Sequence, residues 1–148
     1  MSDQKPGFGP AEMSKLLEDA FAPWVQALGL VPVALTETGA TFRLPGTEAI
    51  ARKGGDGPAV VCGQALAAAA DTAAVLTLCG LNGRFRNCTT VDLTVHFMRP
   101  LMGGEDVEVS VEALSNGRRM ATVRVEFRAA GSAKCAAAAT CAFAYLEN

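Results

Sequence analysis

An uncharged, alanine-rich stretch from Pro58 to Gly80 constrains the fold of this chain most, and Asp71 is its one charged residue. Residues 64–79 are mostly Ala, Leu, Val and Thr, with neither Pro nor Gly, which predicts about four turns of helix. Asp71 lies near the middle, too far from the ends to cap the helix. A carboxylate enclosed by alanines must be hydrogen-bonded, paired or neutralised. We therefore predict that Asp71 is either a catalytic group or a structural acid held by threonine hydroxyls.

The same stretch is long enough to cross a lipid bilayer. Alanine, however, contributes little to membrane insertion, and an Asp at the centre of a span costs roughly 2.5 to 3.5 kcal/mol. Neither Trp nor Tyr flanks the stretch as an interfacial anchor. The sequence therefore favours a buried helix in a soluble protein, and no membrane partner is predicted.

Length and composition predict one domain that spans residues 1–148. The chain has 148 residues, 50% of them hydrophobic, and a formal net charge of -2, which suits a single substantial core. The acidic pI of about 5.4 and the absence of a basic run argue against nucleic acid as a partner. Five cysteines without a C-x-x-C pair are typical of reduced thiols, and residues 1–15 contain no apolar signal segment. We predict a cytoplasmic protein.

The residues before the central helix predict one further helix and two strands. Apolar residues recur at three- and four-residue spacing between about 11 and 28, which indicates an amphipathic helix that ends at Gly29. Two short strands around Gly39 are expected between Val31 and Leu44. Residues 52–58 have the composition of a loop. The core of the domain is thus predicted to cover about 31–146.

After the central helix the sequence alternates with a period of two. Residues 89–98, TTVDLTVHFM, predict a strand with Thr90 on one face and four apolar side chains on the other: Val91, Leu93, Val95 and Phe97. Residues 107–112 and 121–127 alternate in the same way. Between them, Asn116-Gly117 predicts a tight hairpin with left-handed φ values.

The final segment, residues 134–148, is ambiguous because its alanines favour helix and its place after the Gly131-Ser132 turn favours strand. We predict a strand, since a third antiparallel partner extends a hairpin that would be marginal alone. The whole chain then belongs to the α+β class. Its long apolar helix must lie against the apolar face of an antiparallel sheet.

Three segments resemble the hotdog-fold thioesterases, in particular the acyl-CoA thioesterases of the phenylacetate-degradation type. The stretch CGQALAAAADTAAVL resembles the family's central helix, which opens with His-Gly-Gly and carries Ala-Asp-Thr nine residues after the His. The stretch TTVDLTVHFMRP is similar to the strand after that helix. The meander from Gly104 to Tyr145, with its Gly-Arg-Arg turn, resembles the rest of the sheet. The resemblance covers the chain from about Asp56 to its end.

This resemblance implies a hotdog fold, in which an antiparallel sheet of about five to six strands wraps a long central helix. In this chain an additional N-terminal helix is expected before the hotdog core. The resemblance also implies a homodimer with the two central helices side by side and each active site built from both subunits. The sequence leaves open whether such dimers pair into homotetramers, and whether they would do so through helices or through sheets.

The family's catalytic residues correspond to three positions here. Its catalytic carboxylate corresponds to Asp71, and the glycine whose backbone N–H helps form the oxyanion hole corresponds to Gly63. The Ser/Thr beside the active site corresponds to Thr90, with Thr89 as the alternative if the alignment shifts by one residue. Asp71 would act on a thioester as general base for water or as nucleophile, and both routes stay open.

Three further positions depart from the family pattern. Cys62 replaces the His, Gln64 replaces the second Gly, and Asp56 replaces an Asn fifteen residues before the acid. With Thr89, these residues are expected to border the substrate. A backbone oxyanion hole at a helix N-terminus survives side-chain changes as long as the chain still turns there, and Gly63 keeps that geometry accessible.

The predicted function is hydrolysis of an acyl-CoA thioester, without a metal or organic cofactor beyond the coenzyme A of the substrate. A hotdog module that binds an acyl or aromatic ligand without hydrolysing it is the first alternative, and a structural or assembly role is the second. His96 lies in an alternating strand after the helix and is not expected to be catalytic. Several arginines either hold the phosphates of coenzyme A or form a solvated surface: Arg84, Arg86, Arg99, Arg118 and Arg119.

Overall fold

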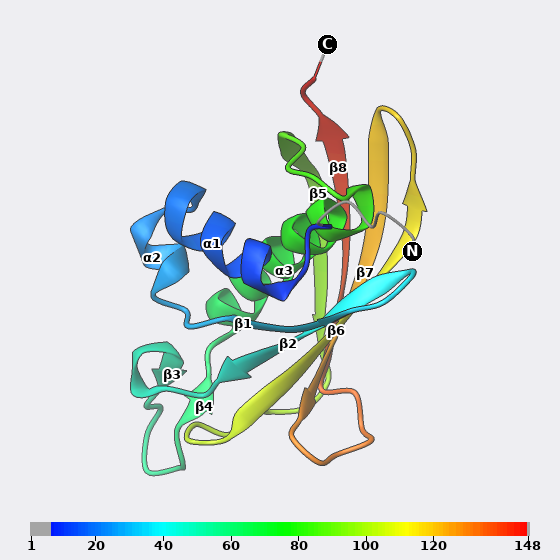
Figure 1. Cartoon of the computed structure of the whole chain (residues 1–148). Helices are drawn as coiled ribbons and strands as arrows, with labels where there is room; N and C mark the ends of the chain where they lie inside the picture. The colour runs from blue at the N-terminus through cyan, green and yellow to red at the C-terminus, as the bar shows by residue number, and fades with distance from the viewer. Residues whose placement is uncertain (1–6, 148) are drawn as a thin grey trace.

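The computed structural model describes residues 7–147, and a six-stranded antiparallel sheet folds around one long helix (Figure 1). Its strand order is β1-β2-β6-β7-β8-β5. The predicted α+β class, with one helix against one sheet, is confirmed. The strands are β1 (Val31–Leu35), β2 (Gly39–Pro45), β5 (Cys88–Phe97), β6 (Asp106–Asn116), β7 (Met120–Ala129) and β8 (Ala137–Tyr145).

The long helix, α3 (Gly63–Asn82), is the centre of the core. Twelve of its 20 residues are buried, and five of these are alanines, whose small side chains let the helix backbone lie close to the sheet. The helix ends at Gly83, whose φ of 70° gives a left-handed C-cap. A window of α3 is long and apolar enough to span a bilayer, yet 67% of it is buried inside the protein. The prediction of a buried core helix is confirmed.

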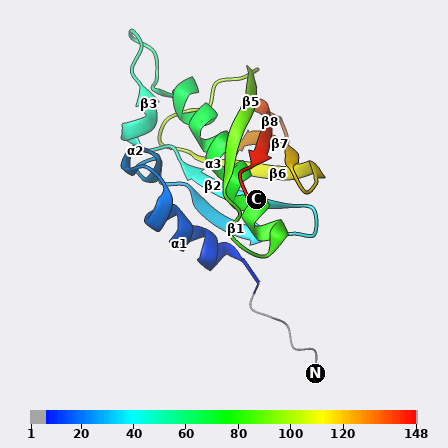
Figure 2. The same cartoon turned by 90° about the horizontal axis from the view of Figure 1, so that it is seen from above.

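The N-terminal region forms two helices, α1 (Pro10–Ala20) and α2 (Pro23–Gln26). The prediction of one helix to about residue 28 is wrong, because the residue before a proline is driven out of the helical region and Ala22 is extended at ψ 145°. The Gln26 side chain donates to the carbonyl oxygen of Phe21 at 2.8 Å, which satisfies a free carbonyl beyond α1. Helix α1 lies beside α3 and β1 (Figure 2).

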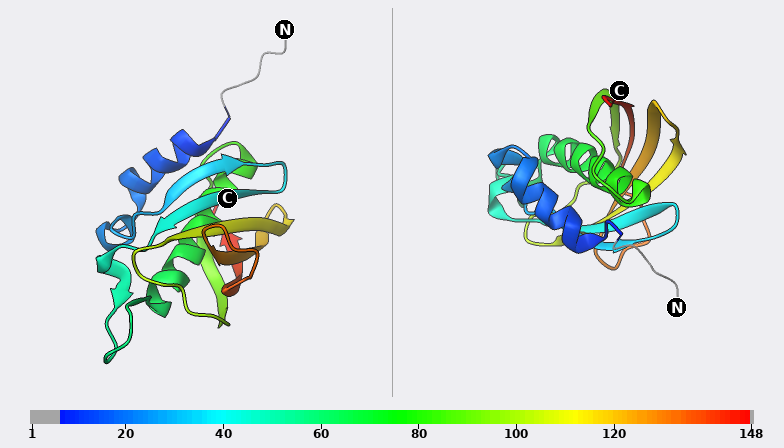
Figure 3. Two further views of the ribbon diagram at one scale, coloured as in Figure 1. Left: turned by 90° about the horizontal axis from the view of Figure 1, so that it is seen from below. Right: turned by 45° about the horizontal axis from the view of Figure 1, so that its top comes forward.

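The two strands predicted between Val31 and Leu44 are confirmed, but the turn between them covers residues 36–38, and Gly39 is the first residue of β2, where it allows β2 to approach β6. A Cβ atom on Gly39 would lie 1.8 Å from the carbonyl oxygen of Val111, so a side chain does not fit there. After β2, the short 3-10 helix η1 (Glu48–Ile50) leads into a two-stranded hairpin of β3 (Ala51–Arg52) and β4 (Val60–Val61). The loop predicted at residues 52–58 forms the end of this hairpin, which extends away from the sheet (Figure 3).

Strands β6, β7 and β8 form the predicted meander, and the final segment is a strand rather than a helix. The prediction of left-handed φ values at Asn116-Gly117 is wrong. Within residues 7–147, only five other glycines have positive φ. The connection is instead a wider turn over residues 117–119, closed by a 2.9 Å hydrogen bond from the Gly117 N–H to the Met120 carbonyl oxygen.

Candidate active site

Asp71 lies on the least buried face of α3, which also carries Gln64, Ala67, Ala68 and Val75 at helical spacing. The expectation that alanines enclose the carboxylate is wrong. The fully buried alanines lie on the other side of the helix, against the sheet, and Asp71 itself is half-buried. The Asp71 side chain therefore stands at an accessible seam between α3 and strand β5.

The hydroxyl Oγ1 of Thr90 donates a 2.7 Å hydrogen bond to Oδ1 of Asp71. This bond joins the middle of α3 to β5 and brings together two of the residues predicted from the sequence. A hydroxyl that donates to a carboxylate fixes its orientation. Among residues 7–147, no side chain or backbone group donates to the second oxygen, Oδ2. The arrangement leaves one carboxylate oxygen free to accept a proton or to attack.

A β-bulge at Val91 turns Thr90 toward Asp71. In the register with β8, Thr90 pairs with Phe143 and Asp92 pairs with Ala142, so Val91 has no partner of its own. Thr90 therefore shares the inner face of the sheet with Leu93, which pairs with the buried Cys141. The prediction of strict alternation, which placed Thr90 on the face opposite Leu93, is wrong. The one extra residue changes the face of the sheet on which Thr90 lies, and nothing in the residue pattern signals this bulge.

The N-terminus of α3 forms the second part of the site. The N-cap residue is Cys62, and the amides of Gly63 and Gln64 in the first turn have no acceptor among residues 7–147. A Cβ atom on Gly63 would lie 3.3 Å from Cζ of Phe97, so this glycine allows the aromatic ring to cover the helix end. The two free amides and the helix dipole suit a developing negative charge.

A cavity of about 340 Å³ adjoins this helix end. Its apolar walls include Leu66, Phe97 and Leu101, and its charged lining residues are Arg52 and Arg99. Among residues 7–147, neither arginine forms an ion pair. Sequence reasoning gave Phe97 no role and did not consider Arg52, because the contacts between the β3–β4 hairpin and the segment after β5, such as the hydrogen bond from the Val61 N–H to the Leu101 carbonyl oxygen, cannot be read from local patterns.

The other predicted substrate-binding residues are dispersed. Gln64 is exposed on the same face of α3 as Asp71, and Cys62 is half-buried with its N–H donated to the Ile50 carbonyl oxygen at 2.8 Å. Asp56 lies in the exposed turn of the β3–β4 hairpin and does not line the cavity. Thr89 pairs with Ala144, on the outer face of the sheet.

Two thiols near Asp71, the half-buried Cys88 and the buried Cys141, are held in the neutral state. Burial, followed by the nearby Cys79 and Asp71, raises the pKa of Cys88 to about 11. Burial raises the pKa of Cys141 to about 12, and the carboxylates of Asp71 and Asp92 add to this shift. Because the thiolate is the nucleophile, neither cysteine is suited to attack a substrate.

A cationic cavity of about 780 Å³ lies at the other end of the site, near the C-terminus of α3. Arg86 forms part of its wall and is held there by three contacts. Its guanidinium lies 3.5 Å from the centre of the Tyr145 ring, pairs with Glu147 and donates to the Arg118 carbonyl oxygen at 2.9 Å. The Tyr145 hydroxyl in turn donates to Asn116 at 2.6 Å. The four arginines that line the cavity are Arg84, Arg86, Arg118 and Arg119.

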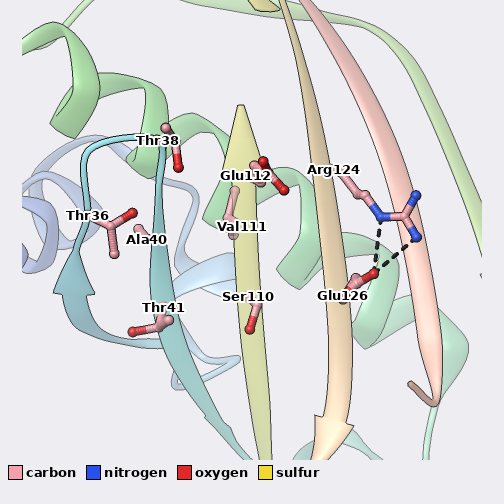
Figure 4. Close-up of a pocket in the computed structure, with 9 residues that line it drawn as sticks. All are labelled: Thr36, Thr38, Ala40, Thr41, Ser110, Val111, Glu112, Arg124 and Glu126. Atoms are coloured by element: carbon pink, nitrogen blue, oxygen red, sulfur yellow. Dashed lines mark hydrogen bonds and ion pairs between the residues drawn. The ribbon is translucent and has the colours of Figure 1, made fainter. Parts of the chain in front are cut away.

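A third cavity, of about 360 Å³, lies on the outer face of the sheet, away from α3 (Figure 4). It is lined mainly by polar side chains of β2, β6 and β7 and by the β1–β2 turn, and an ion pair between Arg124 and Glu126 borders it. It contains neither Asp71 nor the α3 N-terminus. Within residues 7–147, no group of three or more His, Cys, Asp or Glu side chains is placed to hold a metal ion.

The helix wrapped by a six-stranded sheet, with a carboxylate at mid-helix and free amides at the helix N-terminus, defines a hotdog-fold protein. The family model of the thioesterase superfamily matches residues 59–136, which is more than half of the chain. The chain therefore belongs to the thioesterase superfamily. No curated protein matches the sequence.

Solved structures agree with this assignment. A protein from Silicibacter sp. TM1040 is 25% identical, with 97% of this chain and 95% of that chain covered and a TM-score of 0.81. A conserved protein from Pseudomonas aeruginosa is 28% identical, with 87% and 98% covered and a TM-score of 0.74. A thioesterase from Haemophilus influenzae shares the fold at a TM-score of 0.77 and 17% identity, with 93% and 90% covered.

Proposed function

We propose that this protein is an acyl-CoA thioesterase of the phenylacetate-degradation type, in which Asp71 acts on the thioester. The observation that carries the proposal is the 2.7 Å hydrogen bond from Thr90 to Asp71. It orients a half-buried carboxylate toward an accessible seam and leaves its second oxygen free. From that position the carboxylate can take a proton from water, or attack the carbonyl carbon directly.

The amides of Gly63 and Gln64 are the proposed oxyanion hole. A thioester carbonyl that points at them would be polarised by two N–H groups and by the helix dipole. The Cys62 and Gln64 side chains that depart from the family pattern do not remove these backbone donors. Asp56 lies in the exposed hairpin turn and does not line the cavity beside these amides.

A second copy of the chain is needed to complete this site. Gly63 and Asp71 of one chain are separated by about 12 Å along the helix axis, too far to act on one carbonyl. Strand β5 is an edge of the sheet, and its side chains are largely exposed. Antiparallel pairing of two β5 strands about a two-fold axis near Leu93 places Phe97, which touches Gly63, beside the partner subunit's Thr90. We therefore propose a homodimer, with a homotetramer as a further assembly.

The coenzyme A part of the substrate is assigned to the cationic cavity around Arg86. Arg118 and Arg119 form no ion pair among residues 7–147, so their charges are available to phosphates. Arg86 lies two residues before β5 and four residues before Thr90, so the two are at most about 14 Å apart at the chain's limit of about 3.6 Å per residue. A pantetheine arm can bridge such a distance. The five free cysteines suit a reducing compartment, and we propose a cytoplasmic enzyme.

Hydrolysis of a panel of short, long and aromatic acyl-CoA thioesters, followed by the released thiol, tests this function. We expect turnover by the wild type and a loss of at least about 100-fold in kcat for Asp71→Asn, because the amide can neither accept the proton nor attack. The Tm should change little, since Asp71 is half-buried and Asn keeps an acceptor for Thr90.

Asp92→Asn is a matched control, because this carboxylate lies on β5, on the outer face of the sheet away from α3. Full activity of Asp71→Asn would contradict the catalytic assignment. If the folded wild type is stabilised by a thioester but consumes none in the panel, the protein is a ligand-binding module instead.

A further inference from the structure

Building on the proposed thioesterase function, we propose that the acyl group of the substrate occupies the cavity beside the α3 N-terminus, and that this acyl group is short and ends in a carboxylate. Arg52 and Arg99 line that cavity and determine the specificity. A guanidinium suits this task, because its planar fork of N–H donors matches the two oxygens of a carboxylate.

Backbone hydrogen bonds bring the two arginines, which are far apart in the sequence, to one cavity. Arg52 lies on β3, whose partner strand β4 is joined to the segment after β5 by a 2.8 Å bond from the Val61 N–H to the Leu101 carbonyl oxygen. On that segment, the Arg99 N–H donates to the Ala136 carbonyl oxygen at 3.0 Å. The fold therefore holds both residues at the start of α3.

The Arg52 side chain lies over the hairpin turn and is not paired with its neighbours. A Cβ atom on Gly54 would lie 2.6 Å from Nη1 of Arg52, so this glycine leaves the space that the guanidinium occupies. Lys53, the next residue, pairs instead with Glu48 at 3.3 Å. In the part of the chain that the structure describes, Arg52 and Arg99 have no carboxylate partner.

The charge around this cavity is positive although the chain as a whole carries a formal net charge of -2. Among the described residues, no Asp or Glu lines it, and the N-terminus of α3 adds the positive end of a helix dipole beside Gly63. A concave site lined by one sign of charge attracts a ligand of the opposite sign. The cavity is therefore suited to an anionic group.

The remaining walls indicate what joins that anion to the thioester. They are apolar and include Leu66, Phe97 and Leu101. The volume of about 340 Å³ is near the lower end of the roughly 300 to 1,000 Å³ of ligand pockets, which favours a short acyl group. A few methylene groups suit these walls, a terminal carboxylate suits the arginines, and the thioester carbonyl is left at the free amides of the helix.

A pair of substrates that differ only at the end of the acyl chain tests this specificity. Glutaryl-CoA and valeryl-CoA have five acyl carbons each, and only the first ends in a carboxylate. We expect the wild type to hydrolyse glutaryl-CoA with a kcat/KM at least about tenfold higher, because hydrogen bonds between charged groups discriminate by this order. Equal values, or a higher value for valeryl-CoA, would overturn the proposal.

Three variants assign the preference to residues. Arg52→Gln and Arg99→Gln should each lower the ratio of the two kcat/KM values, because each removes one cation from the cavity. Lys53→Gln is the matched control: it removes the same charge from the same hairpin, does not line the cavity, and should keep the wild-type ratio. An unchanged ratio in both arginine variants would overturn the assignment.

The same acyl groups on pantetheine distinguish a carboxylate from the phosphates of coenzyme A. Pantetheine has no phosphate, so a preference for the glutaryl ester that persists on pantetheine and falls in Arg99→Gln supports an acyl site. If Arg99→Gln instead slows both coenzyme A esters equally and leaves both pantetheine esters unaffected, the arginine binds phosphate and the proposal is wrong.

A titration without turnover separates this proposal from the proposed function. The thioethers S-(4-carboxybutyl)-CoA and S-pentyl-CoA cannot be hydrolysed, and calorimetry on the full chain should give the first a Kd about tenfold lower, with the difference reduced in Arg99→Gln. Absence of turnover on every ester contradicts the proposed function. The titration then still decides the specificity, since equal Kd values overturn it and tighter binding of the carboxylated analogue supports it.

Discussion

Gly63 shows how one missing side chain shapes the α3 N-terminus. Its proposed role requires a free amide, and its lack of a Cβ lets the Phe97 ring cover the first turn of the helix. A Cβ there would lie 3.3 Å from Cζ of Phe97 and 3.5 Å from Cε1, close enough to displace the ring by a few tenths of an ångström. Small displacements at a reacting centre affect rate more than they affect stability.

We expect Gly63→Ala to lower kcat by roughly tenfold or more, with a small change in Tm, because the displaced ring alters the access of a carbonyl to the amides. Steady-state kinetics on a thioester that the wild type hydrolyses measures this effect. The additional change Phe97→Leu should restore part of the lost rate, since it removes the ring atoms nearest the new methyl group. No rescue by Phe97→Leu would show that the loss arises elsewhere than at this contact.

The thiols of Cys88 and Cys141 give the protein a predictable response to alkaline pH. The pKa of Cys88 is raised to about 11 and that of Cys141 to about 12, from an ordinary value of 9.0. Below pH 9 both thiols are neutral in the folded and unfolded states, and their contribution to stability is fully present. Above pH 9 the unfolded chain loses these protons first, so the free energy of unfolding should fall as pH rises from about 9 toward 11 and 12.

Urea unfolding at pH 8, 9 and 10 measures this slope. Cys141→Ala should reduce the pH dependence of the free energy of unfolding by the equivalent of up to one proton released on unfolding. It also lowers stability at every pH by leaving a cavity. The slope, and not the absolute stability, is the test. An unchanged slope in Cys141→Ala would mean that this thiol ionises equally in both states.

At the scale of elements, the approach of β2 to β6 depends on Gly39. A Cβ on this residue would lie 1.8 Å from the Val111 carbonyl oxygen and 2.9 Å from its carbonyl carbon, which are backbone atoms and cannot move aside cheaply. We expect Gly39→Ala to lower the free energy of unfolding by on the order of 3 kcal/mol, because the two strands must separate locally.

Equilibrium urea denaturation checks this value. Gly57→Ala is the control, because its Cβ would meet only the Gly54 carbonyl oxygen at 3.9 Å, and it should change stability by less than about 0.5 kcal/mol. Equal stability of Gly39→Ala and Gly57→Ala would be inconsistent with the close approach of β2 and β6.

The elements also show where sequence reasoning succeeds. The period-two pattern and the alanine-rich run predict the meander and α3, because burial repeats at a fixed interval along each of them. The break between α1 and α2 was missed although Pro23 signals it, since the apolar spacing continued past the proline. The wide turn at residues 117–119 was missed because Asn-Gly favours a tight hairpin but does not enforce one.

The site was predictable from the sequence only in part, because some of its residues are brought together by contacts that do not repeat along the chain. Asp71 stands out because a charge in an apolar helix is costly, and the α3 N-terminus follows from where that helix begins. The pairing of Thr90 with Asp71 depends on a bulge that is visible only in the register with β8. The Arg86 cavity depends on contacts between residues about 60 apart in the chain, such as that between Arg86 and Glu147.

At the scale of the whole molecule, the open edge at β5 determines the expected assembly. The opposite edge strand, β1, contains Pro32 and an irregular register with β2, both of which discourage pairing with another chain. Strand β5 has no proline within its bounds and exposes apolar side chains, including Val91 at 57% and Phe97 at 54%. Such an edge is suited to pairing with a second copy.

A charge at the proposed two-fold axis should prevent that pairing. We expect Leu93→Lys to convert a dimer into a monomer, measured by analytical ultracentrifugation, because two lysines would lie opposite each other across the β5 strands. The monomer should lose thioesterase activity, since Gly63 and the partner subunit's Asp71 no longer meet. Leu114→Lys is the matched control: Leu114 is 56% exposed on β6, away from the β5 edge, and its variant should stay dimeric. A Leu93→Lys monomer with full activity would show that one chain contains a complete site, and the roles of Gly63 and Asp71 would then need a different geometry.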